Sequence, residues 1–474
     1  MLVRHSLLYF LVRVGSGIIN FLAILVYTRL ISPADYGQYA LVVSGVGLFN
    51  TVCFQWLRLS LLRFFPKYLE DSQKLFSTIF SGFLGVCFLT GIVGIVLAFT
   101  DFVPLWRNLI FMGVVLLWLE AWLELNLELQ RVKLQPFRYG LMLGIKSAIA
   151  LAVGAVLAMY GLGPYGPLFG LIVGCTLATL FVGRGEWHKI TLAIDRDLLK
   201  ELLKYGLPLT ATFALSFIVS YSDRFIIAWL LGESAAGQYA AVYDLAQQPL
   251  ALLMATINLA SYPLAIRALE KDGKEEADKI LVRNAVLLMG IGLPASLGMI
   301  VLAPNISETL LGVKFRTGAA PVLAWVAGSI CLSGLRAYHF DLAFQLSRHT
   351  VGQVWVAGSA AVLNLILNFW WIPIWGIVGA AYATFAAYFL ALVLSVILGR
   401  RIFCVPVPWW DWVKIAASCV PMVLAILMIK ESHGIVSLSL QVICGMGIYV
   451  VTAMLLNIGN VRSKLLQKLR VGEK

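Results

Sequence analysis

The chain has 474 residues, of which 61% are hydrophobic and only 13% are charged, and its formal net charge is +12. Apolar stretches long enough to cross a bilayer recur from one end to the other, which excludes a soluble globular protein. The seven cysteines are scattered, mostly in apolar segments and without paired ligand spacing, which argues against a zinc site and against a disulfide framework.

Fourteen apolar segments of the length that a membrane-spanning helix needs follow one another along the chain. They lie near residues 6–28, 38–57, 76–99, 108–128, 139–160, 165–183, 206–231, 237–264, 284–303, 319–341, 351–372, 376–399, 411–430 and 435–458. No small-residue cleavage pattern follows the first segment, so we expect it to stay as an anchor. Ser32, Pro33 and Asp35 form a helix-start signal, with serine as the N-cap of the second helix. These patterns predict an all-α, polytopic membrane protein.

The positive charge is distributed unevenly between the two sets of loops. If the N-terminus is cytoplasmic, 26 of the 36 Lys and Arg residues fall on the cytoplasmic side and 5 on the outer side. By the positive-inside rule, this asymmetry predicts that both termini are cytoplasmic. It also accounts for the basic character of the chain, so we do not expect nucleic-acid binding.

The chain repeats itself at an offset of 200 residues. The tetrapeptide Gly-Gln-Tyr-Ala at 37–40 recurs at 237–240, and residues 4–42 share 9 identities in 39 positions with residues 204–242. Both copies enter the membrane from the same side, so the repeats are parallel, and internal repeats in a membrane protein indicate a transporter.

The repeat predicts the domain organisation. We expect two six-helix lobes around a central cavity, an N-terminal lobe at 1–190 and a C-terminal lobe at 191–400. The last two segments fall outside the repeat. Residues 401–474 would therefore form two accessory transmembrane helices followed by a basic cytoplasmic tail.

Several ionisable side chains fall inside the predicted spans, where a charge is costly unless it faces a polar cavity or a partner. Arg13 lies about a third of the way into the first helix; it either faces the cavity or extends to the cytoplasmic headgroups. Asp223 and Arg224 lie well inside the seventh helix, about 100° apart around its axis. Either Arg224 faces the cavity while Asp223 pairs with another helix, or the two are a purely structural buried pair.

The fourth helix carries Glu120, Glu124 and Glu128 at i, i+4 and i+8, hence on one face. Two interpretations are open. Glu120 and Glu124 are candidates for a proton or sodium coupling site, or the acids are counter-ions for Arg13 and Lys146.

Polar residues in later helices add further candidates. Asp244 in the eighth helix could couple transport to an ion, and Arg336 in the tenth could bind substrate. Asn364 and Asn368 share one face of the eleventh helix. They either line the cavity as sugar-binding amides or form ordinary interhelical hydrogen bonds.

Longer stretches carry a family resemblance. They are TRLISPADYGQYALVVSG and LRLSLLRFFPKY in the first half, and SDRFIIAWLLGESAAGQYAAVYDLA, YPLAIRALEKDG and IPIWGIVGAAYATFAAY in the second. Over roughly residues 5–400 the chain resembles the polysaccharide-unit flippases (Wzx type, O-antigen and exopolysaccharide transporters) of the multidrug/oligosaccharidyl-lipid/polysaccharide exporter superfamily. The resemblance implies alternating access by two six-helix lobes. It implies a substrate of undecaprenyl-pyrophosphate-linked oligosaccharide, moved from the inner to the outer leaflet of the bacterial cytoplasmic membrane for surface polysaccharide synthesis.

The resemblance also implies roles for residues and partners. It places basic residues at the inner end of the second helix, where Arg58 is the preferred candidate for facing the anionic substrate. We expect Arg13, Arg58 and Arg224 to bind the pyrophosphate, because guanidinium groups form paired hydrogen bonds with phosphate oxygens. The expected partners are the lipid-linked oligosaccharide and membrane lipids, with a polysaccharide polymerase and a chain-length regulator as candidates. No metal or other cofactor is expected, apart from a proton or sodium ion as the candidate coupling ion.

Other functions remain open. A peptidoglycan lipid II flippase would share the fourteen helices and a basic cavity, whereas a drug/cation antiporter of the same superfamily would have twelve helices and a more acidic cavity. A membrane-embedded polysaccharide polymerase or ligase would need a long outer loop with catalytic side chains. The outer loops here are short and carry no recognisable catalytic motif, so we predict no enzyme and no catalytic residues.

Overall fold

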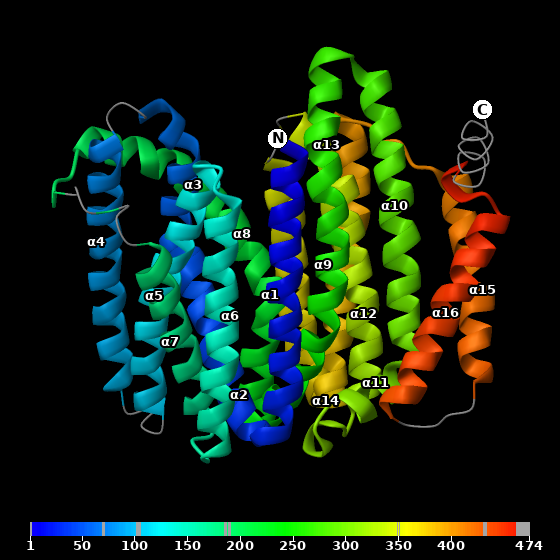
Figure 1. The fold of residues 1–474 in the computed structure, drawn as a ribbon, viewed down its shortest axis with the longest axis horizontal. Helices are drawn as coiled ribbons and strands as arrows, with labels where there is room; N and C mark the ends of the chain where they lie inside the picture. Colours follow the sequence, from blue (N-terminus) through cyan, green and yellow to red (C-terminus); the bar gives the residue numbers. More distant parts are fainter. Residues whose placement is uncertain are drawn as a thin grey trace. The chain divides into compact units, whose positions relative to one another are not determined.

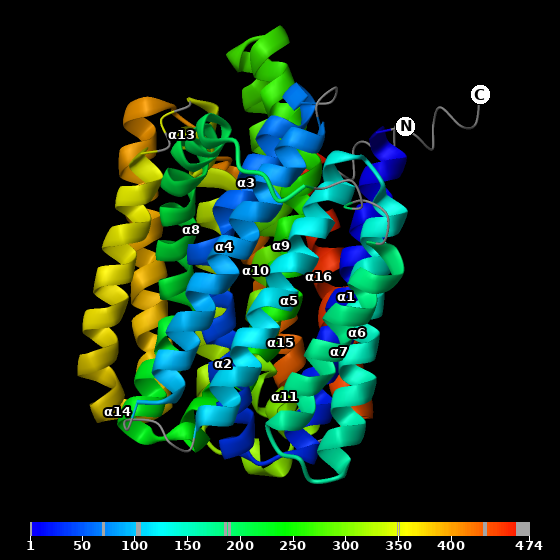
Figure 2. The ribbon, with the colours of Figure 1, turned by 90° about the vertical axis from the view of Figure 1, so that its left-hand side faces the viewer.

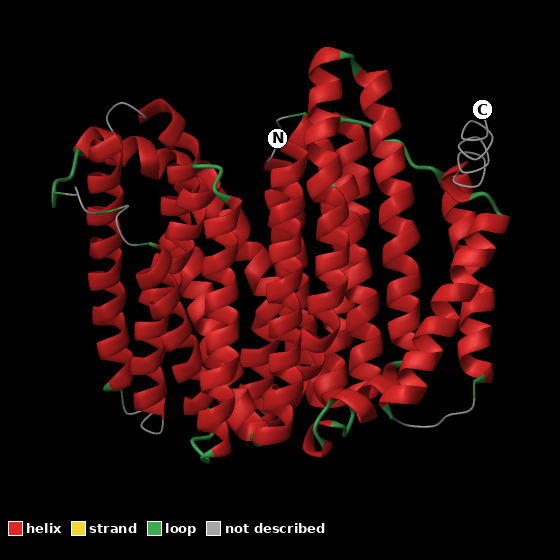
Figure 3. Ribbon diagram, viewed as in Figure 1, coloured by secondary structure: helices red, strands yellow, loops and turns green. Residues whose placement is uncertain are grey.

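The computed structural model of the chain describes residues 2–68, 72–100, 106–183, 187, 191–347, 349, 351–429 and 434–460. This part of the chain is almost entirely helical and contains no strand (Figures 1 and 3). Within it, 13 helices are long and apolar enough to cross a membrane. Large apolar side chains point outward along them, as Phe88 does at 70% exposure. The predicted all-α polytopic membrane fold is confirmed.

The chain divides into two compact units, Met1–Ala240 and Ala241–Lys474. The first unit contains α1 (Leu2–Leu30), α2 (Pro33–Phe49), the π-helix η1 (Asn50–Phe54), α3 (Gln55–Phe64), η2 (Phe65–Tyr68), α4 (Ser72–Ala98), α5 (Arg107–Val132), α6 (Pro136–Met159), α7 (Tyr165–Val182), α8 (Arg196–Leu231) and the start of α9 (Glu233–Lys271). Within it, α4 lies beside α5 (Figures 1 and 2), and α8 packs against α2 and α3. The predicted lobes divide at residue 190, where the sequence repeat places the boundary, whereas the packing divides the chain after Ala240. The two six-helix lobes stay a prediction.

The second unit contains the rest of α9 and the C-terminal helices. These are α10 (Lys274–Val301), α11 (Ala303–Leu310), η4 (Val313–Phe315), α12 (Ala319–Leu335), the π-helix η5 (Arg336–Phe340), α13 (Leu342–Leu346), α14 (Val351–Ile402), α15 (Trp409–Met428), α16 (Ile435–Leu455) and η6 (Ile458–Asn460). The two accessory helices, α15 and α16, pack against each other and against α10, where the Tyr449 hydroxyl donates to the Gly290 carbonyl at 2.7 Å. The predicted basic tail lies outside the described residues.

One helix accounts for two of the fourteen predicted spans. α14 has 52 residues, far more than the roughly 20 needed to cross a bilayer. Gly376 interrupts it with φ 59° and ψ −142°, a conformation that only glycine adopts readily. The helices at 351–375 and 377–402 therefore correspond to the predicted spans at 351–372 and 376–399.

The second span begins where the sequence predicts and continues further than expected. The Ser32 hydroxyl accepts a hydrogen bond from the Asp35 N–H at 3.1 Å, and the Asp35 carboxylate accepts one from the Ser32 N–H at 3.4 Å, which completes a capping box. At Asn50 the helix widens into one π-helical turn and then continues as α3 to Phe64, beyond the predicted end at residue 57. Arg58 therefore lies within a helix and not at its end.

The two repeated tetrapeptides contact each other inside the first unit. A Cβ atom added to Gly37 would overlap the backbone carbonyl of Glu233, and one added to Gly237 would overlap the carbonyl of Pro33. These contacts match under the 200-residue offset, so α2 and the start of α9 cross glycine to glycine. The Glu233 carboxylate accepts hydrogen bonds from Gln38 at 2.6 Å and from the Trp106 indole at 2.9 Å beside this crossing.

Outside the spans, Asp195 joins the first turn of α8 to α4. Its carboxylate accepts hydrogen bonds from the backbone N–H groups of Leu198 at 2.8 Å and Asp197 at 3.1 Å, and it pairs with Lys74 at 2.7 Å. The Leu198 hydrogen bond, followed by the Lys74 contact, lowers the pKa of Asp195 below its usual value.

Candidate functional site

Arg58 is held among polar side chains from three segments of the first unit. Its guanidinium group forms an ion pair with Glu124 of α5 and donates a hydrogen bond to Gln55. Asn50, the first residue of the π-helix, donates to the same Glu124 carboxylate at 2.8 Å. The Arg58 and Glu124 side chains remain 15% and 33% exposed, so a ligand can reach this group. π-Helical turns are frequent at functional sites, and this one presents Asn50 to the ion pair.

The other acids of the predicted stripe on α5 also have basic partners. Glu120 accepts a hydrogen bond from Lys146 of α6 at 2.7 Å, and Glu128 lies 3.4 Å from Arg131 one turn along the helix. The geometry therefore favours the counter-ion interpretation, and Glu124 pairs with Arg58, not with Arg13. Ion coupling at Glu120 and Glu124 stays a prediction.

Asp223 is completely buried and accepts a hydrogen bond from the second copy of the repeated tetrapeptide. The hydroxyl group of Tyr239, the tyrosine of the second copy, donates to the Asp223 carboxylate at 2.7 Å. A short hydrogen bond from a hydroxyl group to a carboxylate offsets part of the cost of burying the charge. Asp223 thus contacts another helix, as one of the two sequence interpretations expects.

Arg224 points elsewhere on the same helix. Its side chain is 3% exposed, with Nη1 at 3.4 Å from the Ser44 hydroxyl of α2. Its guanidinium carbon lies 4.9 Å from the ring centroid of Tyr221, a cation–π distance. The divergent contacts of Asp223 and Arg224 agree with the 100° angle between adjacent helical residues.

Arg13, the remaining arginine of the expected anion-binding set, has an exposed side chain on α1. Its carbonyl accepts a hydrogen bond from the Ser16 hydroxyl at 3.1 Å. Both predicted roles of Arg13 are compatible with this exposure, and its place in a cavity stays a prediction.

The candidates in the second unit lie in two polar groups and one separate position. Arg336 begins the π-helix η5, and its Nε lies 3.5 Å from the carboxylate of the buried Asp341. Asn364 and Asn368 are both fully buried on α14, and the Asn368 amide donates to the Asn364 carbonyl oxygen at 3.0 Å. Asp244 is half-buried on α9. Substrate binding and ion coupling by these residues stay predictions.

Sequence reasoning missed three polar side chains in the groups around Arg58 and Arg224. Gln55 accepts a hydrogen bond from Arg58, Asn50 donates to the Glu124 carboxylate that pairs with Arg58, and Ser44 contacts Arg224. Each of the three is a polar residue within the apolar second segment. Polar residues in such a segment are costly, so their presence there could have marked them as candidates. Among the described residues, no group of three or more His, Cys, Asp or Glu side chains could hold a metal ion.

Solved structures share this fold. A lipid II flippase, MurJ, in an inward closed conformation aligns with a TM-score of 0.80 at 14% identity, over 95% of this chain and 99% of the flippase. An inward-facing multidrug resistance transporter of the MATE family in the MOP superfamily aligns with a TM-score of 0.63 at 13% identity, over 83% of this chain and 97% of the transporter. Identities this low establish the fold alone, which is that of membrane flippases and transporters.

Sequence comparisons identify the family. An uncharacterized membrane protein of Methanocaldococcus jannaschii is 22% identical over 283 residues, which are 58% of this chain and 54% of that protein. The alignment thus spans about half the length of this curated relative. The model of the family described as "Polysaccharide biosynthesis protein" matches residues 26–319, more than half of the chain. The chain is therefore a multi-pass membrane protein that belongs to the polysaccharide biosynthesis protein family and has the flippase and transporter fold of the MOP superfamily.

Proposed function

We propose that the chain moves an oligosaccharide linked to undecaprenyl pyrophosphate from the inner to the outer leaflet of the bacterial cytoplasmic membrane, with both termini cytoplasmic. The family supports a role in polysaccharide synthesis, and the fold supports transport across a membrane. The lipid tail can stay in the bilayer during this step. The pyrophosphate and the hydrated sugar must be carried, because hydrocarbon cannot replace their hydrogen bonds.

The observation that carries the proposal is Arg224, a buried guanidinium group inside a helix long enough to span the membrane. Arginine in a span is costly and marks substrate pathways. Its planar fork binds phosphate oxygens by two parallel hydrogen bonds. Arg224 is only 3% exposed, which fits a carrier in a closed state. A conformational change to an open state would then expose Arg224 to the substrate.

Arg58 and Arg13 complete the anion-binding set in this proposal. Arg58 is partly exposed beside Glu124, whose negative charge balances the arginine while no substrate is bound. A pyrophosphate would compete with that carboxylate for the guanidinium group. Protonation or sodium binding at Glu124, Glu120 or Asp244 would then favour one of the two conformations of the transport cycle. We propose that these residues couple transport to a proton or sodium ion.

Replacement of Arg224 tests the proposal. In a flippase-null strain, Arg224→Ala should abolish surface polysaccharide while the membrane abundance stays near that of the wild-type protein. Arg224→Lys should restore export only in part, since lysine keeps the charge and loses the paired donors. Arg29→Ala is the matched control, because Arg29 is exposed at the end of α1. Normal export by Arg224→Ala would refute the assigned role.

Lipid II is a second candidate substrate, supported by the TM-score of 0.80 with a lipid II flippase over nearly the whole of both chains. Mass spectrometry of lipids from a depletion strain separates the two. Accumulation of a lipid-linked polysaccharide unit supports the first proposal. Accumulation of peptidoglycan precursor supports the second.

A further inference from the structure

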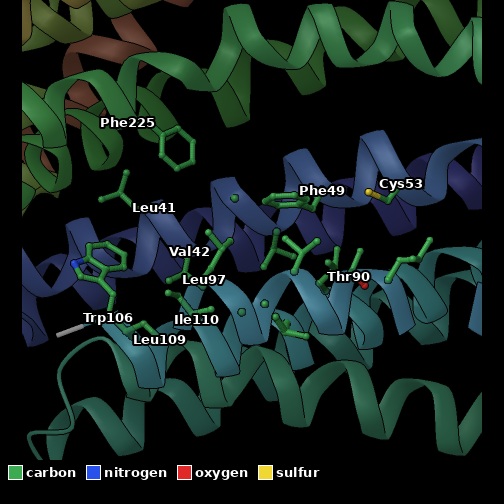
Figure 4. Close-up of a pocket in the computed structure, with 18 of the residues that line it drawn as sticks. Leu41, Val42, Phe49, Cys53, Thr90, Leu97, Trp106, Leu109, Ile110 and Phe225 are labelled. Carbon is green, nitrogen blue, oxygen red and sulfur yellow. The ribbon is translucent and has the colours of Figure 1, made fainter. Parts of the chain in front are cut away.

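A long apolar pocket lies inside the first unit, bounded by α2, α4, α5 and α8 (Figure 4). Its volume is about 480 Å³. It follows α2 from Leu41 to Cys53, a rise of roughly 18 Å, or more than half of the hydrocarbon thickness of a bilayer. A dry cavity of about 150 Å³ holds benzene, so the pocket has room for a hydrocarbon chain of roughly eighteen carbons.

The polar groups in the pocket lining are occupied within the protein. The Thr90 hydroxyl accepts a hydrogen bond from the Trp118 indole at 3.0 Å and donates to the Val86 carbonyl at 2.8 Å. The Trp106 indole at the other end donates to Glu233 at 2.9 Å. The remaining lining is aliphatic or aromatic apart from the thiol of Cys53. A polar ligand would lose its hydration without replacement, so the pocket suits a hydrocarbon.

Two arginines lie close to the pocket lining along the chain. Cys53, at one end, is five residues from Arg58 along the same helical span. The Arg58 Nε is buried and has no hydrogen-bond partner among the described residues, although the other two nitrogens are engaged by Glu124 and Gln55. Phe225, in the pocket wall, directly follows Arg224. The apolar lining therefore ends roughly 7 Å along the helical span from a guanidinium group. This arrangement matches a molecule with an anionic head and a long apolar tail.

We propose that this pocket receives the part of the isoprenoid chain nearest the pyrophosphate of the lipid-linked substrate, with the pyrophosphate at the Arg58 end and the tail directed toward Leu41 and Trp106. The inference rests on the proposed function. Lipid tails are as apolar as the pocket, so leaving the bilayer contributes little free energy. The pocket contributes contacts on several sides of the chain, and it directs the head group toward Arg58.

Gly45 allows the pocket to be filled selectively. A Cβ atom there would meet nothing nearer than the Phe225 ring at 4.0 Å, so Gly45→Phe places a ring in the pocket without a backbone clash. Gly85 on α4 is also open, with nothing within 4 Å, and it lies outside the lining. Gly85→Phe is therefore the matched control.

The test uses the full chain in lipid nanodiscs with two polyprenyl pyrophosphate probes. One probe carries a photoreactive diazirine near the pyrophosphate and the other carries it farther along the tail, and adducts are mapped by mass spectrometry. We expect the first to label the segments around Cys53 and Thr90, and the second those around Leu41 and Leu109. Unlabelled polyprenyl pyrophosphate should displace both, Gly45→Phe should lose these adducts, and Gly85→Phe should keep them.

The outcomes separate this inference from the proposed function. Displaceable labelling on other helices, or labelling that Gly45→Phe leaves in place, overturns the pocket assignment while the proposed function stands. Equal labelling by a diazirine phospholipid that polyprenyl pyrophosphate does not displace also overturns it. The absence of any displaceable labelling by either probe overturns both. A thermal transition of Gly45→Phe close to that of Gly85→Phe shows that lost adducts do not reflect unfolding.

Discussion

The crossing of the two repeated tetrapeptides should tolerate no side chain at Gly37. The Cβ atom of Gly37→Ala would overlap the Glu233 carbonyl, and a backbone atom cannot move aside as a flexible side chain can. Overpacking typically costs about 1–3 kcal/mol, and alanine returns roughly 0.5–1 kcal/mol through its better helix propensity. Because this overlap involves backbone, we take the upper part of the range and expect a net loss of about 2 kcal/mol.

The free energy of unfolding in mixed micelles measures this loss. Gly237→Ala should cost a similar amount, because its Cβ would overlap the Pro33 carbonyl across the same crossing. The double variant should lose less than the sum, since a single separation of the helices relieves both overlaps. Gly85→Ala, at an open position in α4, should be neutral or stabilising. Equal stability of Gly37→Ala and Gly85→Ala would refute the close crossing.

Three further outcomes can be measured on the purified protein. Tyr239→Phe removes a donor at 2.7 Å from the buried Asp223 carboxylate and should cost about 1.5–3 kcal/mol of unfolding free energy; an unchanged value contradicts a charge-assisted bond. A double-mutant cycle with Glu120→Gln and Lys146→Met should give a coupling of about 1–3 kcal/mol, between the values for exposed and buried pairs, and zero coupling contradicts the pair. The folded-state pKa of Asp195 is lowered, so its stabilisation is complete above the unfolded pKa of about 3.9 and is lost as the pH falls through the folded pKa. The stability difference between wild type and Asp195→Asn should therefore be constant near neutral pH and shrink in acid; a difference that grows in acid contradicts this sign.

Local sequence signals predicted the elements of the fold because they act within one helix. The capping box of Ser32 and the break at Gly376 are both decided by residues next to them. The π-helix at Asn50–Phe54 has no such signal. It shifts the hydrogen-bond register by one residue, and tertiary packing against α5 and α8 determines whether that shift is favourable.

The candidate site was predicted as a set of residues and not as a set of pairs. Arg58 was predicted at the inner end of the second span and Glu124 inside the fourth, yet they are 66 positions apart, and no spacing rule joins two helices at that separation. The Arg58 pair depends on how far the second span continues past the π-helical turn. The link from Tyr239 to Asp223 joins neighbouring helices and was equally invisible, although both residues had been singled out.

The two copies of the repeat share the residues that pack the helices together but not the charged residues. Gly37 and Gly237 occupy equivalent positions and make equivalent close contacts, as expected for residues that hold two helices together. Asp223 and Arg224 correspond to Ala23 and Ile24, so these two charges belong to one copy only. Tyr39 and Tyr239 are also equivalent, and Tyr239 donates to Asp223, whose counterpart in the first copy is Ala23. Positions needed for packing alone could hold Ala and Ile, as the first copy does, since a buried charge costs free energy that these apolar residues do not. The charges at 223 and 224 are therefore best explained by a task that only the second copy performs, which is the reason to test Arg224 first.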